Sequence, residues 1–369
     1  ATIIKRSFDT LDLYIQPYHD LNDQSFITLY QPSFFTNPAE IPLFGTRKDP
    51  IHPQTQQTKI TYSSGFSGAK YGSAVAIGNS TLVVANDATI GAVYAYDMNG
   101  GNEVIISASD FANDDAFGIS VAVGNNKIVV GASSDDDGGN ATGSVYVYNL
   151  DGTGEVKITA SDADPDDTFG RAVAIGHSKV VIGAPFADET ANNTGTVYIF
   201  DQDGTNQVKV TASDNTVSTL NRKFGEALAV GSNKIVVGAP GVENEKGAVY
   251  IYNMDGTGEV KIQASDGIAS DKFGSSVAIS DNYVIVGAWG DDDDGSTSGS
   301  AYIYNLDGTN ERKVTASNAG ASDRFGYAVA VGANVAIVGA PYEDADANNA
   351  GAIYRFTLDA VTIVPTFEI

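Results

Sequence analysis

The chain has 369 residues with a formal net charge of −25 and no cysteine, and hydrophobic residues make up 42% of it. Its acidity argues against nucleic-acid binding, which needs a basic surface, and the lack of cysteine excludes disulfides. No apolar run reaches the roughly 18 residues of a membrane-spanning helix, so the sequence predicts a large apolar core without such a span.

Residues 1–56 form an N-terminal extension that lacks the pattern seen in the rest of the chain. Residues 11–18 and 25–35 alternate polar and apolar side chains and are predicted strands, with Pro17 and Pro32 confining them to edges or ends. Residues 36–56 are rich in proline and are predicted to be an extended linker. Two interpretations stay open: the extension packs against its own chain, or it is an arm that anchors the protein on another subunit.

The first twelve residues include two basic side chains but no apolar stretch of signal-peptide length, so no export signal is predicted. Ala1 fits a native start after loss of the initiator methionine. It fits a processed precursor equally well.

An aromatic-Gly pair marks a unit that recurs through residues 57–360. A repeat at intervals of about 50 residues is typical of propeller blades or solenoid coils. The six pairs are Tyr71-Gly72, Phe117-Gly118, Phe169-Gly170, Phe224-Gly225, Phe273-Gly274 and Phe325-Gly326.

Each unit contains four short strand patterns. The first follows the aromatic-Gly pair, as in residues 172–176, and the second is a continuous apolar run such as 127–132. The third, such as 196–200, alternates Val or Ile with Tyr or Phe, so both of its faces are apolar and need cover. The fourth, such as 157–161, alternates polar and apolar residues as an outer edge strand should. Asp-Gly pairs predict hairpins between the third and fourth strands.

These patterns predict an all-β protein whose main domain is a β-propeller of six four-stranded blades, preceded by the β-rich extension. Because a strand between two neighbouring blades has both faces covered, the tyrosines of the third strands are expected to pack between blades. They are Tyr146, Tyr198, Tyr250 and Tyr302. The glycines that end the second strands, such as Gly183, are expected to provide positive φ or close backbone packing.

Residues 59–64 are expected to close the ring. They match residues 157–162 in sequence, yet they stand alone before the first aromatic-Gly pair, so they would complete the sixth blade as its fourth strand. The tail, residues 361–369, competes for this place, with Pro365 against it. If the tail closes the ring instead, a seventh, irregular blade becomes the alternative.

One copy of the unit holds a set of motif residues nearly intact: Ser161-Asp162, Asp167, Phe169-Gly170, Val173-Ala174, Gly183-Ala184-Pro185, Gly195 and Tyr198. This set resembles the FG-GAP family, in the variant that runs from Ala-Ser-Asp through Asp-x-Phe-Gly to Val-Gly-Ala-Pro and Gly-x-x-Tyr-Val. The resemblance covers residues 103–356, with a degenerate first copy from residue 59.

The resemblance implies a propeller that acts in surface or extracellular recognition, as in integrin α-subunit heads and many bacterial surface proteins. In integrin-like members a calcium loop lies between the first and second strands. Here that position holds only short turns such as residues 124–127, too short to supply the 6–8 oxygens that calcium takes. The calcium sites of those members therefore do not carry over.

More than half of the 46 acidic residues fall in the loops that join second to third and fourth to first strands. These loops are predicted to emerge at one end of the ring, on a scaffold suited to carrying function. They are either a solvated face rich in Asx-turns or a surface that binds calcium or a basic partner. Crowded carboxylates need counter-charge, so the candidate metal ligands are Asp135, Asp136, Asp137, Asp291, Asp292, Asp293 and Asp294.

No catalytic residues are predicted. An Asp recurs two residues before Phe-Gly, at Asp115, Asp167, Asp271 and Asp323, where it is expected to hold its loop by accepting backbone hydrogen bonds. The three histidines follow no metal-ligand spacing, and no nucleophile elbow, P-loop or dinucleotide motif occurs. The protein is therefore predicted not to be an enzyme and to require no cofactor.

The sequence favours a non-enzymatic structural or binding propeller displayed on a virus particle, such as a phage capsid or tail protein. An extracellular-type repeat without an export signal fits release by lysis, and residues 1–56 suit an anchor to other virion proteins. The acidic loops would recognise a host-surface glycan or protein, and a homo-oligomer is compatible with this interpretation. The alternative is a secreted or cell-surface bacterial adhesin, and a polysaccharide-acting enzyme is less favoured.

Overall fold

The structure is a computed structural model that describes residues 59–61, 71–86, 91–112, 114–189, 191–215, 221–332, 334–344 and 349–358, together with the backbone of three strands nearer the N-terminus. The chain divides into two units, Ala1–Gln57 and Thr58–Ile369. None of the helices in the described residues is long and apolar enough to cross a membrane.

The N-terminal unit contains an antiparallel sheet of three strands, β1 (Ile4–Phe8), β2 (Leu11–His19) and β3 (Ser25–Tyr30). Strands β2 and β3 confirm the two that the alternation predicts, and β3 ends before Pro32. Pro17 departs from the prediction because it lies in the central strand, opposite Ile27. However, β1 pairs with β2 only as far as Ile15, so the missing N–H of Pro17 falls where β2 has a neighbour on one side.

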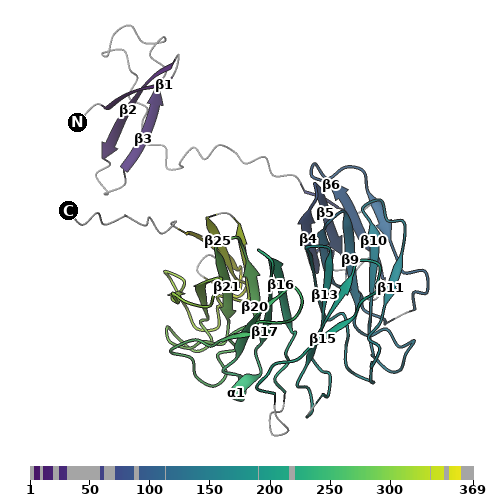
Figure 1. Ribbon diagram of the computed structural model, residues 1–369. Helices are drawn as coiled ribbons and strands as arrows, with labels where there is room; N and C mark the ends of the chain where they lie inside the picture. Colours follow the sequence, from purple (N-terminus) through teal and green to yellow (C-terminus); the bar gives the residue numbers. More distant parts are fainter. Residues whose placement is uncertain are drawn as a thin grey trace, which may run out of the picture. The chain divides into compact units, whose positions relative to one another are not determined.

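The second unit is a β-propeller of six antiparallel blades in chain order, which Figure 1 shows from blue through green to yellow. This confirms the predicted fold. Blade 1 consists of β4 (Ala74–Gly78), β5 (Thr81–Ala85), β6 (Val93–Asp97) and β7 (Val104–Ile106). Blade 2 consists of β8 (Phe117–Gly124), β9 (Lys127–Ala132), β10 (Ser144–Asn149) and β11 (Val156–Ile158). Blade 3 consists of β12 (Ala172–Gly176), β13 (Lys179–Ala184), β14 (Thr196–Asp201) and β15 (Val208–Val210).

The last three blades repeat this order, and one helical turn, α1 (Val242–Glu245), interrupts a loop of blade 4. Blade 4 consists of β16 (Ala227–Gly231), β17 (Lys234–Ala239), β18 (Ala248–Asn253) and β19 (Val260–Ile262). Blade 5 consists of β20 (Ser276–Ile279), β21 (Tyr283–Ala288), β22 (Ser300–Asn305) and β23 (Arg312–Val314). In the described residues, blade 6 has three strands, β24 (Ala328–Gly332), β25 (Val335–Ala340) and β26 (Ala352–Thr357).

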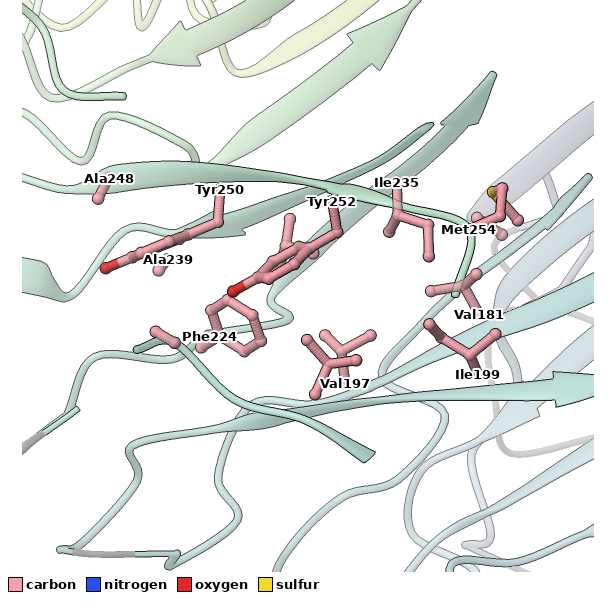
Figure 2. Packing of buried hydrophobic residues seen from close by; sticks show 14 of the residues in the cluster. Val181, Val197, Ile199, Phe224, Ile235, Ala239, Ala248, Tyr250, Tyr252 and Met254 are labelled. Atoms are coloured by element: carbon pink, nitrogen blue, oxygen red, sulfur yellow. The ribbon is translucent and has the colours of Figure 1, made fainter. Parts of the chain in front are cut away.

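The core lies between consecutive blades. Tyr198 is buried against Val145 and Val147 of blade 2, and its ring meets Phe169 edge to face with centroids 5.4 Å apart. Figure 2 shows the next interface, where Tyr250 and Tyr252 of blade 4 lie over Phe224 and the valine and isoleucine side chains of blade 3. The four tyrosines expected between blades, Tyr146, Tyr198, Tyr250 and Tyr302, are at most 1% exposed, which confirms the prediction.

The glycines that end the second strands allow neighbouring backbones to touch. A Cβ at Gly183 would lie 2.1 Å from the carbonyl oxygen of Gly225, the glycine of the next Phe-Gly pair. A Cβ at Gly131, Gly238 or Gly287 would lie equally close to the carbonyl oxygen of the glycine in the next Phe-Gly pair. Close packing is therefore the reason for these glycines, and positive φ is found instead at the glycine of each Phe-Gly pair, such as Gly225 at +95°.

The seam between blade 6 and blade 1 lacks this contact in the structure. Gly339, the equivalent of Gly183, would place a Cβ no closer than 3.7 Å to any atom, and Gly72 of blade 1 would meet nothing within 4 Å. Val75 of β4 is 64% exposed and Ile353 of β26 is 77% exposed, although their equivalents elsewhere pack between blades. Both edges therefore carry the residues of a blade interface.

Residues 59–61 lie where the outer strand of a preceding blade would be. Ile60 packs against Tyr94 and Tyr96 of blade 1 and would contact a Cβ at Gly100. Gly152 of blade 2 has the same relation to the preceding outer strand, where Ile106 is the equivalent of Ile60 and would lie 3.3 Å from a Cβ at Gly152. This placement favours residues 59–64 as the fourth strand of blade 6, whereas the tail, residues 361–369, lies outside the described residues.

Replacing Tyr198 with Ala is expected to lower the free energy of unfolding by about 3–5 kcal/mol, because it removes a large side chain from a packed interface. Chemical denaturation monitored by circular dichroism measures this change. A loss below about 1 kcal/mol would show that the interface does not depend on the tyrosine.

Ring closure predicts a specific cross-link. Ile60 corresponds to Ile158 and Ile353 to Val145, and Val145 and Ile158 are paired directly across β10 and β11. The double variant Ile60→Cys/Ile353→Cys is therefore expected to form an intramolecular disulfide, the only one in a chain without native cysteine. Mass spectrometry of the oxidised monomer detects it. The mismatched pair Ile60→Cys/Val208→Cys should not cross-link, and equal behaviour of the two pairs would contradict closure by residues 59–64.

Candidate functional site

The two sets of long loops meet at the same end of the propeller. The backbone N–H groups of Asp166, Thr168 and Phe169, before blade 3, donate to carbonyl groups in the second-to-third loop of blade 2. Those of Ser322, Arg324 and Phe325, before blade 6, donate in the same way to the loop of blade 5. The structure therefore confirms a single loop face, which is held together by backbone hydrogen bonds between consecutive blades.

A lysine at the centre of a carboxylate cluster forms the main polar feature of this face in blade 2. The Lys157 Nζ atom lies 2.7 Å from Asp110, 3.0 Å from Asp135 and 2.6 Å from Asp137. The Tyr146 hydroxyl also contacts Asp110 and Asp135, at 2.8 Å each. Asp110 belongs to the connection that precedes the blade, so the cluster joins the fourth-to-first loop to the second-to-third loop. We call this cluster the lysine latch.

The lysine latch recurs in blades 3 to 5. Blade 5 reproduces it fully, with Lys313 2.8 Å from Asp266, 2.9 Å from Asp291 and 2.5 Å from Asp293. Blades 3 and 4 keep the lysine, the tyrosine and the preceding Asp and vary the loop carboxylate: Lys209 with Asp162 and Glu189, and Lys261 with Asp214 and Glu243. In blade 4 the buried Arg222 adds a second cation beside Asp214.

Opposite charge shifts the ionisation of these groups. Burial raises the pKa of Asp110, but hydrogen bonds from Lys157 and Tyr146 outweigh burial and hold this pKa below its ordinary value. The same balance lowers the pKa of Asp162, Asp214 and Asp266. Burial alone would lower the pKa of Lys157, yet its hydrogen bonds to the carboxylates raise it. Asp110 and Lys157 are therefore both charged at neutral pH.

The repeat is matched by a family model. The family described as FG-GAP repeat matches residues 101–148, 153–200, 205–252, 257–304 and 309–356, together more than half of the chain. The chain belongs to the FG-GAP repeat family. Each match runs from the hairpin before a fourth strand to the end of the next third strand, so one FG-GAP repeat spans two consecutive blades.

Because one repeat spans two consecutive blades, the Ser-Asp pair of the FG-GAP motif can connect them. In one copy, the Ser213 N–H and hydroxyl donate to Glu259 of the next hairpin, at 2.9 and 2.5 Å. Asp214 accepts from Tyr250 of the same blade as Glu259. The pair thus connects the outer strand of one blade to the blade that follows, and both of its side chains are engaged.

The Asp before Phe-Gly holds its loop as predicted. Asp167 accepts a hydrogen bond from the backbone N–H of Asp164 at 3.0 Å, and Asp115, Asp271 and Asp323 accept equivalent bonds. All four side chains are buried. Burial raises the pKa of Asp167 to about 6, helped by the charges of Asp164, Asp188 and Glu189 and opposed by the backbone hydrogen bond.

The seven candidate metal ligands fall into two kinds. Asp135 and Asp291 are buried in latches, and Asp137 and Asp293 pair with the latch lysines, so lysine provides the counter-charge that the crowding requires. Asp136, Asp292 and Asp294 are exposed. In the described residues no group of three or more His, Asp or Glu is arranged to hold a metal ion. Calcium binding at these loops stays a prediction.

Sequence reasoning missed the latch lysines. Lys157, Lys209, Lys261 and Lys313 each begin the Lys-x-Thr-Ala-Ser or related run of a fourth strand, and each is paired in register with a third-strand tyrosine. The recurrence of Lys at this position, opposite Tyr and between acidic loops, is the feature that could have revealed them.

Blade 6 carries a variant of the latch without a lysine in the described residues. The Tyr354 hydroxyl donates to Asn318 at 2.7 Å, and the Asn318 amide donates to Glu343 at 2.7 Å. Lys59 corresponds to Lys157 in the repeat. The closing strand would therefore bring the missing lysine next to Glu343.

Replacing Lys313 with Met is expected to lower the free energy of unfolding by about 1–3 kcal/mol at pH 7, because Asp291 is left buried without its cation. The pKa of Asp266 is lower in the folded state than in the unfolded chain, so the stability it contributes is present above about pH 4 and is lost as the pH falls below that. The difference between wild type and variant should therefore shrink at low pH. Lys234→Met is the matched control, since in the described part of the chain the Lys234 ammonium donates only to the neutral side chain of Asn253; an equal loss in both variants would contradict the latch.

Replacing Asp167 with Asn tests the raised pKa. Because the folded-state pKa of about 6 exceeds the unfolded value, the wild type binds more protons when folded, and its stability falls as the pH rises from about 4 to 6. In the Asn variant the free energy of unfolding should not show this decrease between about pH 4 and 6. Denaturant titrations at pH 4.5 and 7.5 measure it. Asp203→Asn is the control, because the pKa of Asp203 is lowered by its hydrogen bonds from Thr205 and its effect has the opposite sign.

Proposed function

We propose that this protein is a non-enzymatic binding propeller displayed on a virus particle, where residues 1–56 attach it to other virion proteins and the loop face recognises a surface ligand. The observation that carries the proposal is the separation of the chain into two units. One unit contains a three-stranded sheet and the other is a propeller that forms its own core. This division supports a proposal in which one unit attaches the protein and the other recognises a ligand.

The rigidity of the loop face supports a role in recognition. Four lysine latches bind the second-to-third loops to the connection that precedes their own blade, and backbone hydrogen bonds bind the same loops to the connection before the next blade. Exposed side chains on these loops are therefore presented at fixed positions, which lowers the entropy lost when a partner binds.

The environment of the titratable groups supports a non-enzymatic role. Asp167, whose raised pKa would suit a general acid, is buried and bonded to the backbone of its own loop. Hydrogen bonds from lysine and tyrosine lower the pKa of Asp110, Asp162, Asp214 and Asp266, which is the opposite of what an acid catalyst needs at neutral pH. The hydrogen bonds and ion pairs of these groups stabilise the loops, which is consistent with a protein that needs no cofactor and catalyses no reaction.

Deleting residues 1–56 is expected to leave a soluble propeller that no longer joins its assembly, because the core of the propeller is formed by its own blades. Circular dichroism and thermal unfolding check the fold, and co-sedimentation with particles from the producing culture checks assembly. The full-length double variant Asp292→Asn/Asp294→Asn is the control and should still assemble.

Three outcomes would change the proposal. Unfolding of the truncated protein would mean that the extension is part of the fold, and assembly without residues 1–56 would mean that the attachment lies elsewhere. Sedimentation of the full-length protein with bacterial cells rather than particles would favour a cell-surface adhesin instead.

A further inference from the structure

Cationic and aromatic side chains replace the carboxylates at two places in the described part of the loop face. One is the pair of Lys223 and Phe186, with 5.5 Å between the ammonium nitrogen and the ring centroid, and the other is larger. It lies between blades 5 and 6 and consists of Trp289, Arg324, Tyr327 and Tyr342, which we call the aromatic patch. Arg324 stacks on two rings, with its guanidinium carbon 4.8 Å from the Trp289 centroid and 4.6 Å from that of Tyr342. The Tyr327 ring lies 6.4 Å from Trp289.

The guanidinium group of Arg324 stacks on the two rings and forms no ion pair with a carboxylate among the described residues. The latch lysines, in contrast, each contact two or three carboxylates. Lys272 also approaches Trp289, at 5.2 Å, but it is neutralised by Glu245 at 2.9 Å. Arg324 is thus a fixed guanidinium whose hydrogen-bond donors are available to a ligand.

The aromatic patch is a departure from the repeat that the fold does not require. Trp289 stands where blades 3, 4 and 6 have the proline of the Gly-Ala-Pro motif, and Tyr327 stands where blades 5 and 1 have Ser275 and Ser73. Tyr327 is 49% exposed and Tyr342 is 40% exposed, in a protein whose other aromatic side chains mostly pack between blades. Because the neighbouring residues at the Tyr327 position are small serines, ring closure would leave this ring accessible.

We propose that the aromatic patch binds a carboxylated sugar, such as a uronic acid unit of an acidic polysaccharide. A guanidinium pairs with a carboxylate through two parallel hydrogen bonds, and the negative face of an aromatic ring attracts the C–H groups of a sugar ring. Exposed carboxylates on the same loop, such as Asp292 and Asp294, accept hydrogen bonds from sugar hydroxyls. The surrounding negative charge disfavours densely charged polymers such as nucleic acids. A sugar with one carboxylate per ring can pair that carboxylate with Arg324 and donate hydrogen bonds from its hydroxyl groups to the nearby aspartates.

This inference rests on the proposed recognition function and names the ligand class of its loop face. The test is calorimetric titration of the full-length protein with trigalacturonate, and with its methyl ester as the uncharged comparator. The wild type is expected to bind the acid at least tenfold more tightly than the ester, with affinity falling as salt rises. Arg324→Gln should weaken binding of the acid at least tenfold.

Arg312→Gln is the matched control, because Arg312 also stacks on a tyrosine, Tyr283, with 5.4 Å between guanidinium and ring, but lies on the outer strand of blade 5. It should bind the acid as the wild type does. Arg324→Lys keeps the charge without the paired donors and should restore only part of the affinity. Thermal unfolding of each variant confirms that the fold is retained.

Binding of the ester as tightly as the acid, unchanged binding by Arg324→Gln, or no binding by the wild type at millimolar trigalacturonate would each overturn the proposal. Equal binding of a glutamate tripeptide would show that the patch selects charge and not sugar, and would overturn it as well. Assembly through residues 1–56 is measured separately by co-sedimentation. A negative titration would therefore leave the attachment role intact, and a negative co-sedimentation result would leave the sugar-binding result intact.

Discussion

The fold depends on the third strand of each blade, because both faces of this strand are apolar and must be buried. Third strands such as β14 (Thr196–Asp201) alternate valine or isoleucine with tyrosine or phenylalanine, and both faces are buried. Such a strand needs a sheet against each face, which a stack of blades supplies. The Phe-Gly pair serves the same need, because Phe169 meets Tyr198 edge to face while Gly170 leaves room for the backbone of Ser144, whose carbonyl oxygen would lie 2.6 Å from a Cβ at this position. The family motif is therefore mostly a description of the interface between two blades.

The acidic character of the chain has a structural explanation in its loops. Asp110 and Asp135 are placed by different loops, and they lie close together because Lys157 and the Tyr146 hydroxyl bind both. The latch thus converts crowded carboxylates into a cross-link between the two loop sets of one blade. This cross-link is used again in blades 3 to 5, so the two loop sets are joined in the same way along much of the described loop face.

Much of the fold could be predicted because its determinants are local in sequence. The period, the Asp-Gly hairpins and the two-sided apolar strands specify blades without knowledge of contacts, and the buried tyrosines follow. The lysine latch could not be predicted in the same way, because the pairing of Lys157 with Asp110 depends on how successive blades stack. The aromatic patch was missed for a related reason: Trp289, Arg324 and Tyr342 come from three separate segments, and only their stacking distances show that they belong together. Calcium binding and display on a virus particle rest on features that the fold alone does not decide.

The same two-sided burial predicts that the ring closes, since β26 (Ala352–Thr357) and β4 (Ala74–Gly78) carry interface residues that no blade covers in the described part of the chain. Hydrogen–deuterium exchange of the full-length protein tests this most directly. The account predicts that the backbone amides of β26 exchange as slowly as those of β14, because both strands would lie inside a closed ring and open only with global unfolding. Exchange of β26 orders of magnitude faster than that of β14 would contradict closure, and with it the claim that every third strand is covered on both faces.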